Sequence, residues 1–132
     1  MSARPLKYGF KKMLAAANAV IETVSVADLP YLQDDPDALL LDVRDSEERE
    51  AEGLIPGSIH VPRGLLEFIA DPESPIHETA ITPERRLVLY CGTGGRSALA
   101  AKTLHDMGYP DVLSLAGGYA AWTAAGNSGL KP

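Results

Sequence analysis

The residues Leu87-Val-Leu-Tyr-Cys-Gly-Thr-Gly-Gly-Arg-Ser97 decide the fold of this chain. An apolar run leads directly into a loop with three glycines, and a helical pattern follows over 97–107, where Gly108 ends it. A short, continuous apolar run is typical of a strand that is buried on both faces of a parallel sheet. We therefore expect a buried strand, a tight loop and a helix in close succession. The helix residues expected to face the core are Leu99, Leu104 and Met107.

Strand-like and helical segments alternate along the rest of the chain. The expected strands are 23–26, 39–43, 59–61, 87–90 and 112–115, and the expected helices are 26–33, 47–52, 65–69, 97–107 and 119–125. This alternation predicts an α/β fold, with a mostly parallel central sheet and helices on both faces. Ligands of such sheets bind beyond the carboxyl ends of the strands, and Asp42 and Cys91 both lie at such ends.

The size and composition indicate one globular domain. The chain has 132 residues, of which 45% are hydrophobic and 23% are charged. The single cysteine excludes an internal disulfide and a multi-cysteine metal cage, so we expect no metal. No run approaches the ~18 to 20 apolar residues that cross a bilayer, so we expect no membrane association.

The net charge of −6 is distributed unevenly. Residues 22–84 carry 16 acidic residues against three arginines, whereas residues 85–132 carry five basic residues against two acidic ones. An acidic middle repels a phosphate backbone, so we expect no nucleic-acid partner. The basic final third can still hold a local anion site, and the only cysteine lies there.

Residues 1–22 are interpreted as an N-terminal helical extension that precedes a domain over 23–130. Its apolar side chains recur at helical spacing, at Phe10, Leu14, Ala17 and Ile21. Lys11 and Lys12 before a run of small residues partly fit a signal peptide, but the apolar stretch is short and Asn18 interrupts it. Because a free thiol also fits a reducing compartment, we expect a cytoplasmic protein.

The loop after the first quoted strand has the features of an anion site. Its glycines, Gly92, Gly94 and Gly95, allow the backbone to curl so that several N–H groups point at one place. The following helix adds unpaired N–H groups and the positive end of its dipole. Arg96 adds a fixed charge, so the loop favours a Cys91 thiolate, which is a nucleophile.

This loop resembles the active-site loop of rhodanese-like sulfurtransferases, in which an arginine follows the cysteine after four residues. Two further blocks, in the right order, are similar to signatures of that family: 41–62, with Asp42-Val-Arg44 and a Gly-Leu-Ile-Pro-Gly run, and 115–122, with Gly117-Gly118. The segment 62–75 resembles a bacterial single-domain branch. The resemblance covers about residues 37–125. The chain departs from the pattern at Leu54, where the family often has histidine after its glycine.

The resemblance implies a mechanism. A thiolate takes the outer sulfur of a donor such as thiosulfate, holds it as a persulfide, and passes it to cyanide or a thiol, with no metal or organic cofactor. The implied catalytic residue is Cys91. The implied binding residues are Gly92, Thr93, Gly94, Gly95, Arg96 and Ser97.

Several residues keep two interpretations. Asp42 either orients the loop or caps the helix that starts near Asp45. Arg63 either brings positive charge to an anionic donor or is solvated. Arg44 and Glu48 are four residues apart, which is typical of an ordinary helical ion pair. Close backbone approach is expected at Gly117 and Gly118, and a core position is expected for Trp122.

Two other functions remain open. A related phosphatase or arsenate reductase also uses a cysteine loop, but the related phosphatases place arginine six residues after the cysteine rather than five, which makes a wider ring. A non-catalytic binding or regulatory module is the other alternative, although family members of that class often lack the cysteine. The sequence indicates no particular oligomeric state.

Overall fold

The computed structural model describes residues 4–132 and forms an α/β domain around one five-stranded sheet. The strand order is β1-β5-β4-β2-β3, and every pair of neighbours is parallel. The strands are β1 (Glu22–Val24), β2 (Ala38–Asp42), β3 (Ile59–His60), β4 (Arg86–Tyr90) and β5 (Val112–Leu115). The predicted fold class is confirmed, and the sheet is wholly rather than mostly parallel.

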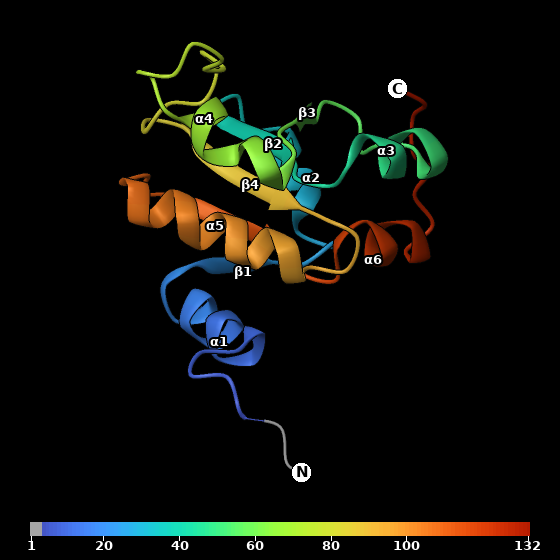
Figure 1. Cartoon of the computed structure of the whole chain (residues 1–132). Helices are drawn as coiled ribbons and strands as arrows, with labels where there is room; N and C mark the ends of the chain where they lie inside the picture. The colour runs from blue at the N-terminus through green and yellow to red at the C-terminus, as the bar shows by residue number, and fades with distance from the viewer. Residues whose placement is uncertain (1–3) are drawn as a thin grey trace.

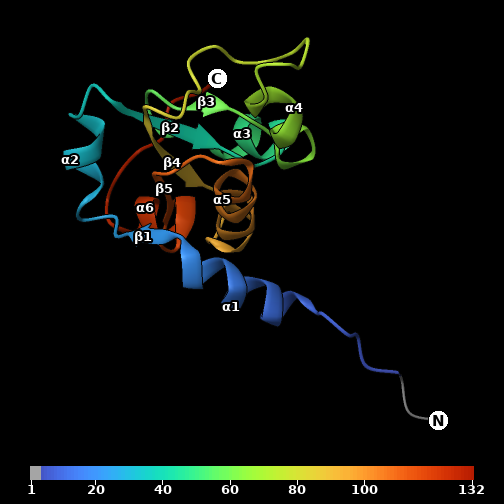
Figure 2. The same ribbon diagram turned by 90° about the vertical axis from the view of Figure 1, so that its left-hand side faces the viewer.

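Helices cover both faces of the sheet (Figures 1 and 2). One face carries α1 (Phe10–Val20), the 3₁₀ turn η1 (Arg63–Leu65), α4 (Leu66–Ala70) and α5 (Gly95–Met107); the other carries α2 (Leu29–Gln33) and α6 (Gly118–Ala124). The helix α3 (Ser46–Glu52) lies beyond the carboxyl end of β2, on the side to which β4 points (Figure 1). The carboxyl edge of the sheet is therefore framed by α3, α5 and α6.

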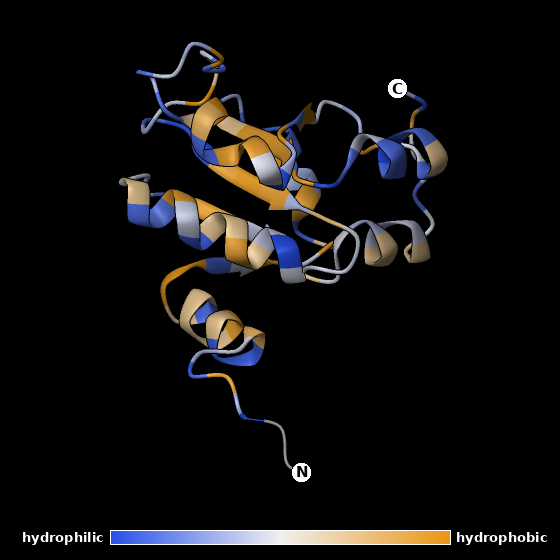
Figure 3. Ribbon diagram, in the orientation of Figure 1, coloured by the Kyte–Doolittle hydropathy of each residue, from blue (hydrophilic) through white to orange (hydrophobic). Residues whose placement is uncertain are grey.

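Each face of the sheet buries its own apolar cluster, and the strands between them are the most hydrophobic part of the ribbon (Figure 3). Leu87 and Leu89 of β4 pack toward α5, whereas Val88 and Tyr90 pack toward α6. This alternation buries residues 87–90 of β4, as their continuous apolar run predicts, and leaves only Arg86 at the start of the strand exposed. Trp122 is buried in the second cluster, which confirms its predicted core position.

Some predicted boundaries were wrong, and one side chain on each of two predicted apolar helix faces, Phe10 and Met107, is exposed. The helix expected from residue 26 begins at Leu29, because Ser25 first closes a turn in which its side chain accepts the N–H of Asp28. Phe10 is 65% exposed, since α1 contacts the core only from Leu14 onward. Met107 is 39% exposed, because it is the last residue of α5 and borders a surface hollow.

The last residues of the chain return to the carboxyl edge of the sheet. Leu130 pairs with Leu54 through two backbone hydrogen bonds, of 2.8 and 2.9 Å. The hydroxyl of Tyr119 donates to the carbonyl of Glu52, 2.7 Å away, and so joins α6 to the end of α3.

Within residues 4–132, no helix combines the length and the apolar composition needed to cross a membrane.

Candidate active site

Cys91 is the first residue after β4, and its sulfur lies inside the loop that follows. The backbone N–H groups of Gly94 and Ser97 donate to Sγ over 3.1 and 3.3 Å. The thiol itself donates to the hydroxyl oxygen of Ser97, 3.5 Å away, and that oxygen lies 2.7 Å from the hydroxyl of Ser114. The loop therefore directs N–H groups at one sulfur atom, as predicted. Cys91 as a whole residue is 1% exposed.

Two opposing effects act on the acidity of this thiol. Burial alone would raise the pKa of Cys91. Hydrogen bonds from the Ser97 side chain and from the backbone of Ser97, Gly94 and Thr93 outweigh burial and hold the pKa below its ordinary value. The site thus favours the thiolate, the reactive form of cysteine.

The start of α6 fixes the shape of the loop from outside. Tyr119 N–H donates to the carbonyl of Cys91 over 2.8 Å, and Ala120 N–H donates to the carbonyl of Gly92 over 3.0 Å. In a trans peptide the C=O and the N–H of the following residue point in opposite directions. Because the carbonyl groups of Cys91 and Gly92 point toward α6, the N–H groups of the residues after them point away from α6. Gly118 makes the approach possible, since a Cβ there would lie 2.5 Å from the Cys91 carbonyl oxygen. The predicted close approach at Gly118 is confirmed.

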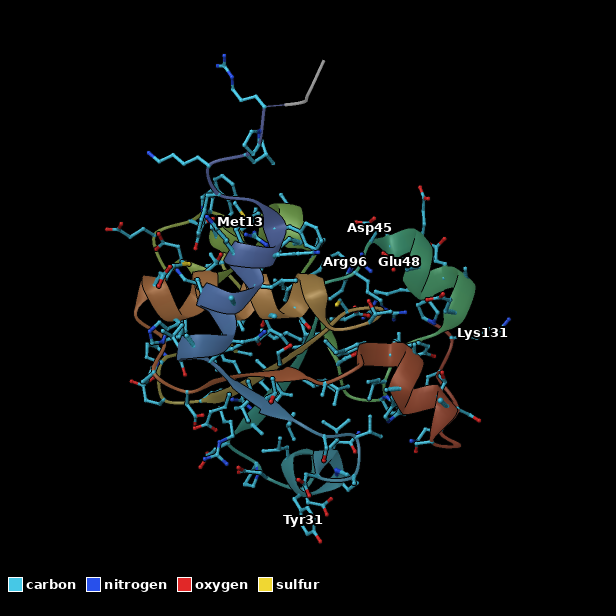
Figure 4. The ribbon with its side chains drawn as sticks, turned by 90° about the horizontal axis from the view of Figure 1, so that it is seen from below. Met13, Tyr31, Asp45, Glu48, Arg96 and Lys131 are labelled. Atoms are coloured by element: carbon cyan, nitrogen blue, oxygen red, sulfur yellow. The ribbon has the colours of Figure 1, made fainter. Side chains whose placement is uncertain are left out.

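Arg96, at the start of α5, pairs with a carboxylate from another helix. Its guanidinium donates to both oxygens of Glu48, over 2.6 and 2.8 Å, and Figure 4 shows the two side chains meeting between α5 and α3. This fork lowers the pKa of Glu48 to about 2. Arg96 therefore holds α3 against the loop.

The interpretation of Arg44 and Glu48 as an ordinary helical ion pair was wrong. Arg44 is fully buried and donates from Nε and Nη2 to Asp42, over 2.8 to 3.3 Å, and from Nη2 to the carbonyl of Gly53 over 2.8 Å. Its guanidinium carbon lies 4.3 Å from the ring centre of Tyr119. Arg44 precedes α3 rather than belonging to it, so its side chain turns inward, away from Glu48.

Asp42 serves this arginine network and does not cap α3. It also accepts from Arg49 over 2.9 Å. Burial alone would raise its pKa, but the hydrogen bonds from Arg44 hold the pKa below its usual value. The cap of α3 is Asp45, which forms a capping box with Glu48. Asp42 pairs in register with Tyr90, so it lies one strand away from the residue before Cys91.

Arg63 lies apart from the cysteine loop. Its guanidinium donates to Glu67 over 3.2 Å and to the hydroxyl of Thr103, also over 3.2 Å. These partners are on α4 and the middle of α5, and no described contact joins Arg63 to the residues around Cys91. The structure thus gathers residues 91–97 in one place, brings Asp42 beside them, and leaves Arg63 elsewhere.

A pocket opens beside the loop. Two of its lining residues, Gly92 and Thr93, belong to the loop; the others are Glu48, Glu52, Tyr119, Ala120 and Thr123. Within residues 4–132, no group of three His, Cys, Asp or Glu side chains is arranged to hold a metal ion.

The family model of the rhodanese-like domain matches residues 25–125, which is most of the chain. The chain belongs to the rhodanese-like domain family.

Two curated relatives of this rhodanese-like domain carry sulfurtransferase names. A sulfurtransferase of Allochromatium vinosum is 38% identical over 95 residues, which cover 72% of this chain and 80% of that protein. The human thiosulfate:glutathione sulfurtransferase is 32% identical over 106 residues, which cover 76% of this chain and 91% of that protein. These relatives support sulfur transfer of the rhodanese type.

A solved structure from Rhodopseudomonas palustris matches nearly the whole rhodanese-like chain. It is 42% identical, its TM-score is 0.89, and the match covers 96% of this chain and 98% of that one. That protein is described as one of unknown function and a possible tyrosine phosphatase. The match extends the shared fold beyond residues 25–125 to most of the N-terminal segment.

Three residues of the site went unrecognised in the sequence. The spacing of four residues pairs Glu48 with Arg44, whereas its partner in the structure is Arg96, 48 residues away, a separation that no local pattern predicts. Ser114 lies on β5, and its contact with Ser97 depends on the strand order. Tyr119 directly follows Gly117 and Gly118. This glycine pair was the one signal in the sequence that the helix after it lies close to another backbone segment.

Proposed function

We propose that this rhodanese-like domain moves a sulfane sulfur from a donor such as thiosulfate to cyanide or a thiol through a persulfide on Cys91. The observation that carries the proposal is the sulfur of Cys91 inside a ring of N–H donors, with its pKa below the ordinary value. The cycle uses no metal or organic cofactor. A free thiol also fits the reducing cytoplasm, which we propose as its compartment.

Both steps of the proposed cycle balance. The Cys91 thiolate attacks the outer sulfur of thiosulfate, the S–S bond of the donor breaks, and its electron pair leaves with sulfite. Cyanide then attacks the outer sulfur of the persulfide, the new S–S bond breaks, and its electron pair returns to Cys91 as thiocyanate departs.

The start of α5 offers further support for the persulfide. Among the described residues, the N–H groups of Gly95 and Arg96 have no hydrogen-bond acceptor. These are the unpaired donors of a helix N-terminus, and a second sulfur attached to Cys91 gives them an anionic partner. The same donors stabilise the charge that develops as sulfur is transferred.

Intact mass after incubation with thiosulfate tests the proposal. The chain is expected to gain one sulfur atom and to lose it when cyanide is added. Cys91→Ser is expected to gain none and to form no thiocyanate, because the chain has no second cysteine. Thiocyanate production by the variant at the native rate would disprove the covalent mechanism.

A protein-tyrosine phosphatase is the second candidate, because of the description of the Rhodopseudomonas palustris protein. The loop argues against it. The arginine follows Cys91 by five residues, which makes a smaller ring than the related phosphatases use, and Arg96 is already paired with Glu48. We therefore expect negligible hydrolysis of an aryl phosphate by the native chain.

A further inference from the structure

The three arginines around the candidate site are all engaged by carboxylates. Arg96 pairs with Glu48 through both oxygens. Arg44 pairs with both Asp42 and Glu52, Arg49 pairs with Asp42, and the side chains of the two arginines are 0% and 12% exposed. Each of these three guanidinium groups therefore already has a carboxylate partner, and none is left unpaired for an anion that approaches the loop.

The pocket beside the loop has a distinct polarity. It measures about 440 Å³, a size that suits a small organic molecule. Its charged lining consists of Glu48 and Glu52, and no lysine, arginine or histidine is among its described lining residues. The side chain of Glu52 is 55% exposed at the rim of the pocket, and its Oε2 accepts a hydrogen bond from Nη1 of the buried Arg44 over 3.1 Å.

The helix that forms this rim strengthens the negative potential. From its cap at Asp45 to Glu52, the segment carries five acidic residues against Arg49 alone. Lys131 lies near the far end of α3, and Figure 4 shows its side chain pointing outward, away from Arg96. A thiolate or persulfide at Cys91 adds one more negative charge.

We infer that Glu48 and Glu52 determine which acceptors the loop serves: thiols that carry a positive charge, such as aminothiols, are used in preference to thiols that carry a carboxylate. This inference rests on the proposed persulfide at Cys91. An ammonium group in the pocket lies among carboxylates, whereas a carboxylate in the same place is repelled. One unit charge about 5 Å from another at a partly exposed site changes a rate on the order of tenfold.

The transfer to such a thiol is balanced without another reagent. The acceptor thiol gives its proton to the outer sulfur of the anionic Cys91 persulfide, and the resulting thiolate attacks that sulfur, so that a new S–S bond forms. The bond between the two sulfurs of the enzyme breaks, and its electron pair stays on Cys91 as a thiolate. The acceptor leaves as a persulfide that keeps the proton.

The experiment compares three small thiols as acceptors from the isolated Cys91 persulfide. Cysteamine carries an ammonium group, 2-mercaptoethanol is neutral, and 3-mercaptopropionate carries a carboxylate. Single-turnover rates are expressed per thiolate, to correct for the different acidities of the three thiols. We expect cysteamine to react about tenfold faster than 3-mercaptopropionate, and the ratio to approach one at about 1 M salt.

Glu48→Gln is the test variant, and Glu47→Gln is its matched control. Glutamine at position 48 preserves the capping box of α3 but removes the charge that neutralises Arg96. We expect the ratio to fall about tenfold in this variant, because Arg96 becomes free to attract a carboxylate. Glu47 is exposed on the same helix and does not line the pocket, so its variant should keep the native ratio.

A second variant, Glu52→Gln, is expected to lower the ratio without changing the partner of Arg96. The inference is overturned if the native chain shows no preference, or if Glu48→Gln and Glu47→Gln give the same ratio. Intact mass before the thiol is added separates the two proposals. A chain that gains the sulfur but shows no preference refutes only the acceptor inference, and a chain that gains no sulfur refutes the proposed function as well.

Discussion

At the scale of single residues, Cys91 combines burial with the donors that a buried anion needs. A buried thiolate without partners is unfavourable, and burial alone raises a thiol pKa. Here two backbone N–H groups reach the sulfur, and the Ser97 hydroxyl lies within reach of it. The Ser97 hydroxyl donates to the carbonyl of Gly94 over 3.1 Å, and the neighbouring Ser114 hydroxyl can donate to Ser97. Turning the Ser97 proton toward a thiolate therefore exchanges the Gly94 carbonyl for a charged acceptor.

The first prediction at this scale concerns the ionisation of Cys91. Iodoacetamide alkylation followed against pH should give a midpoint below the model thiol value of about 8.5. Ser97→Ala should shift the midpoint upward, because one donor to the thiolate is lost while the backbone donors remain. Because the folded pKa is lowered, this group stabilises the fold above its unfolded pKa, and the contribution is lost as the pH falls through the folded pKa.

Urea unfolding of Ser97→Ala at neutral pH shows whether the variant is folded when the profile is measured. A midpoint at or above the model value in the native chain would show that the loop donors do not stabilise the thiolate. An unchanged midpoint in the variant would remove Ser97 from that role.

At the scale of elements, the loop is shaped by the contact between its carbonyl groups and the start of α6. Gly118 has a φ of +59° and leaves no space for a Cβ, so both its backbone conformation and its surroundings require glycine. Gly57 has a φ of +82°, but no atom lies within 4 Å of a Cβ built there. Alanine substitutions at the two positions therefore distinguish the effect of backbone strain, which both would have, from the effect of close approach, which only the one at Gly118 would have.

Gly118→Ala should lose most sulfur transfer and more than about 2 kcal/mol of unfolding free energy, because the added methyl group pushes α6 away from Cys91 and Gly92. Gly57→Ala should lose about 1 kcal/mol from strain alone and keep its transfer rate. Thiocyanate formation and urea unfolding measure the two effects. Equal transfer rates in the two variants would show that the contact with α6 does not shape the loop.

Loop width gives a second prediction at this scale. Inserting one glycine between Gly94 and Gly95 moves the arginine to the sixth position after Cys91 and widens the ring. Hydrogen bonds to charged groups contribute about 1.5 to 3 kcal/mol each, so losing two aligned donors should slow transfer by about 10²-fold or more. Parallel assays with thiosulfate and an aryl phosphate measure it. Undiminished sulfur transfer by the wider loop would remove ring size as the argument against a phosphatase.

The sequence predicted the elements better than it predicted their partners. The strand, loop and helix of 87–107 follow from a buried apolar run and from glycines that a tight curl requires. The partner of Glu48 could not be read locally, because Arg96 belongs to an element that only the parallel strand order brings near. The partners of Arg44 are close in sequence, but a spacing rule for helices does not apply to them because Arg44 lies before α3. The exposure of Phe10 shows a related limit: periodicity finds a helix face, but not how far the core extends along it.

At the scale of the whole molecule, Arg44 joins three parts of the carboxyl edge. It binds Asp42 at the end of β2, the carbonyl of Gly53 after α3, and the ring face of Tyr119 on α6. The guanidinium is fully buried, so removing the fork would take this donor from the Gly53 carbonyl and leave Asp42 with Arg49 as its one paired arginine.

Arg44→Lys should therefore lower the free energy of unfolding by about 3 kcal/mol, because an ammonium cannot reproduce the planar fork. Arg86→Lys is the matched control, since Arg86 pairs with Asp111 at the surface, and it should lose less than about 1 kcal/mol. Urea denaturation of both variants measures the difference. Similar losses in the two variants would contradict a structural role for the buried fork.

The return of the chain to Leu54 has a practical consequence for anyone who attaches the protein to a resin, a dye or a fusion partner. Leu130 is hydrogen-bonded beside α3, the helix that carries Glu48, and the C-terminus lies next to that helix in Figure 1. The segment before α1 leaves the domain on another side, well away from α3 (Figures 1 and 2). A purification tag therefore belongs ahead of α1. A bulky group after Pro132 would lie close to α3, the helix that forms the acidic rim of the pocket.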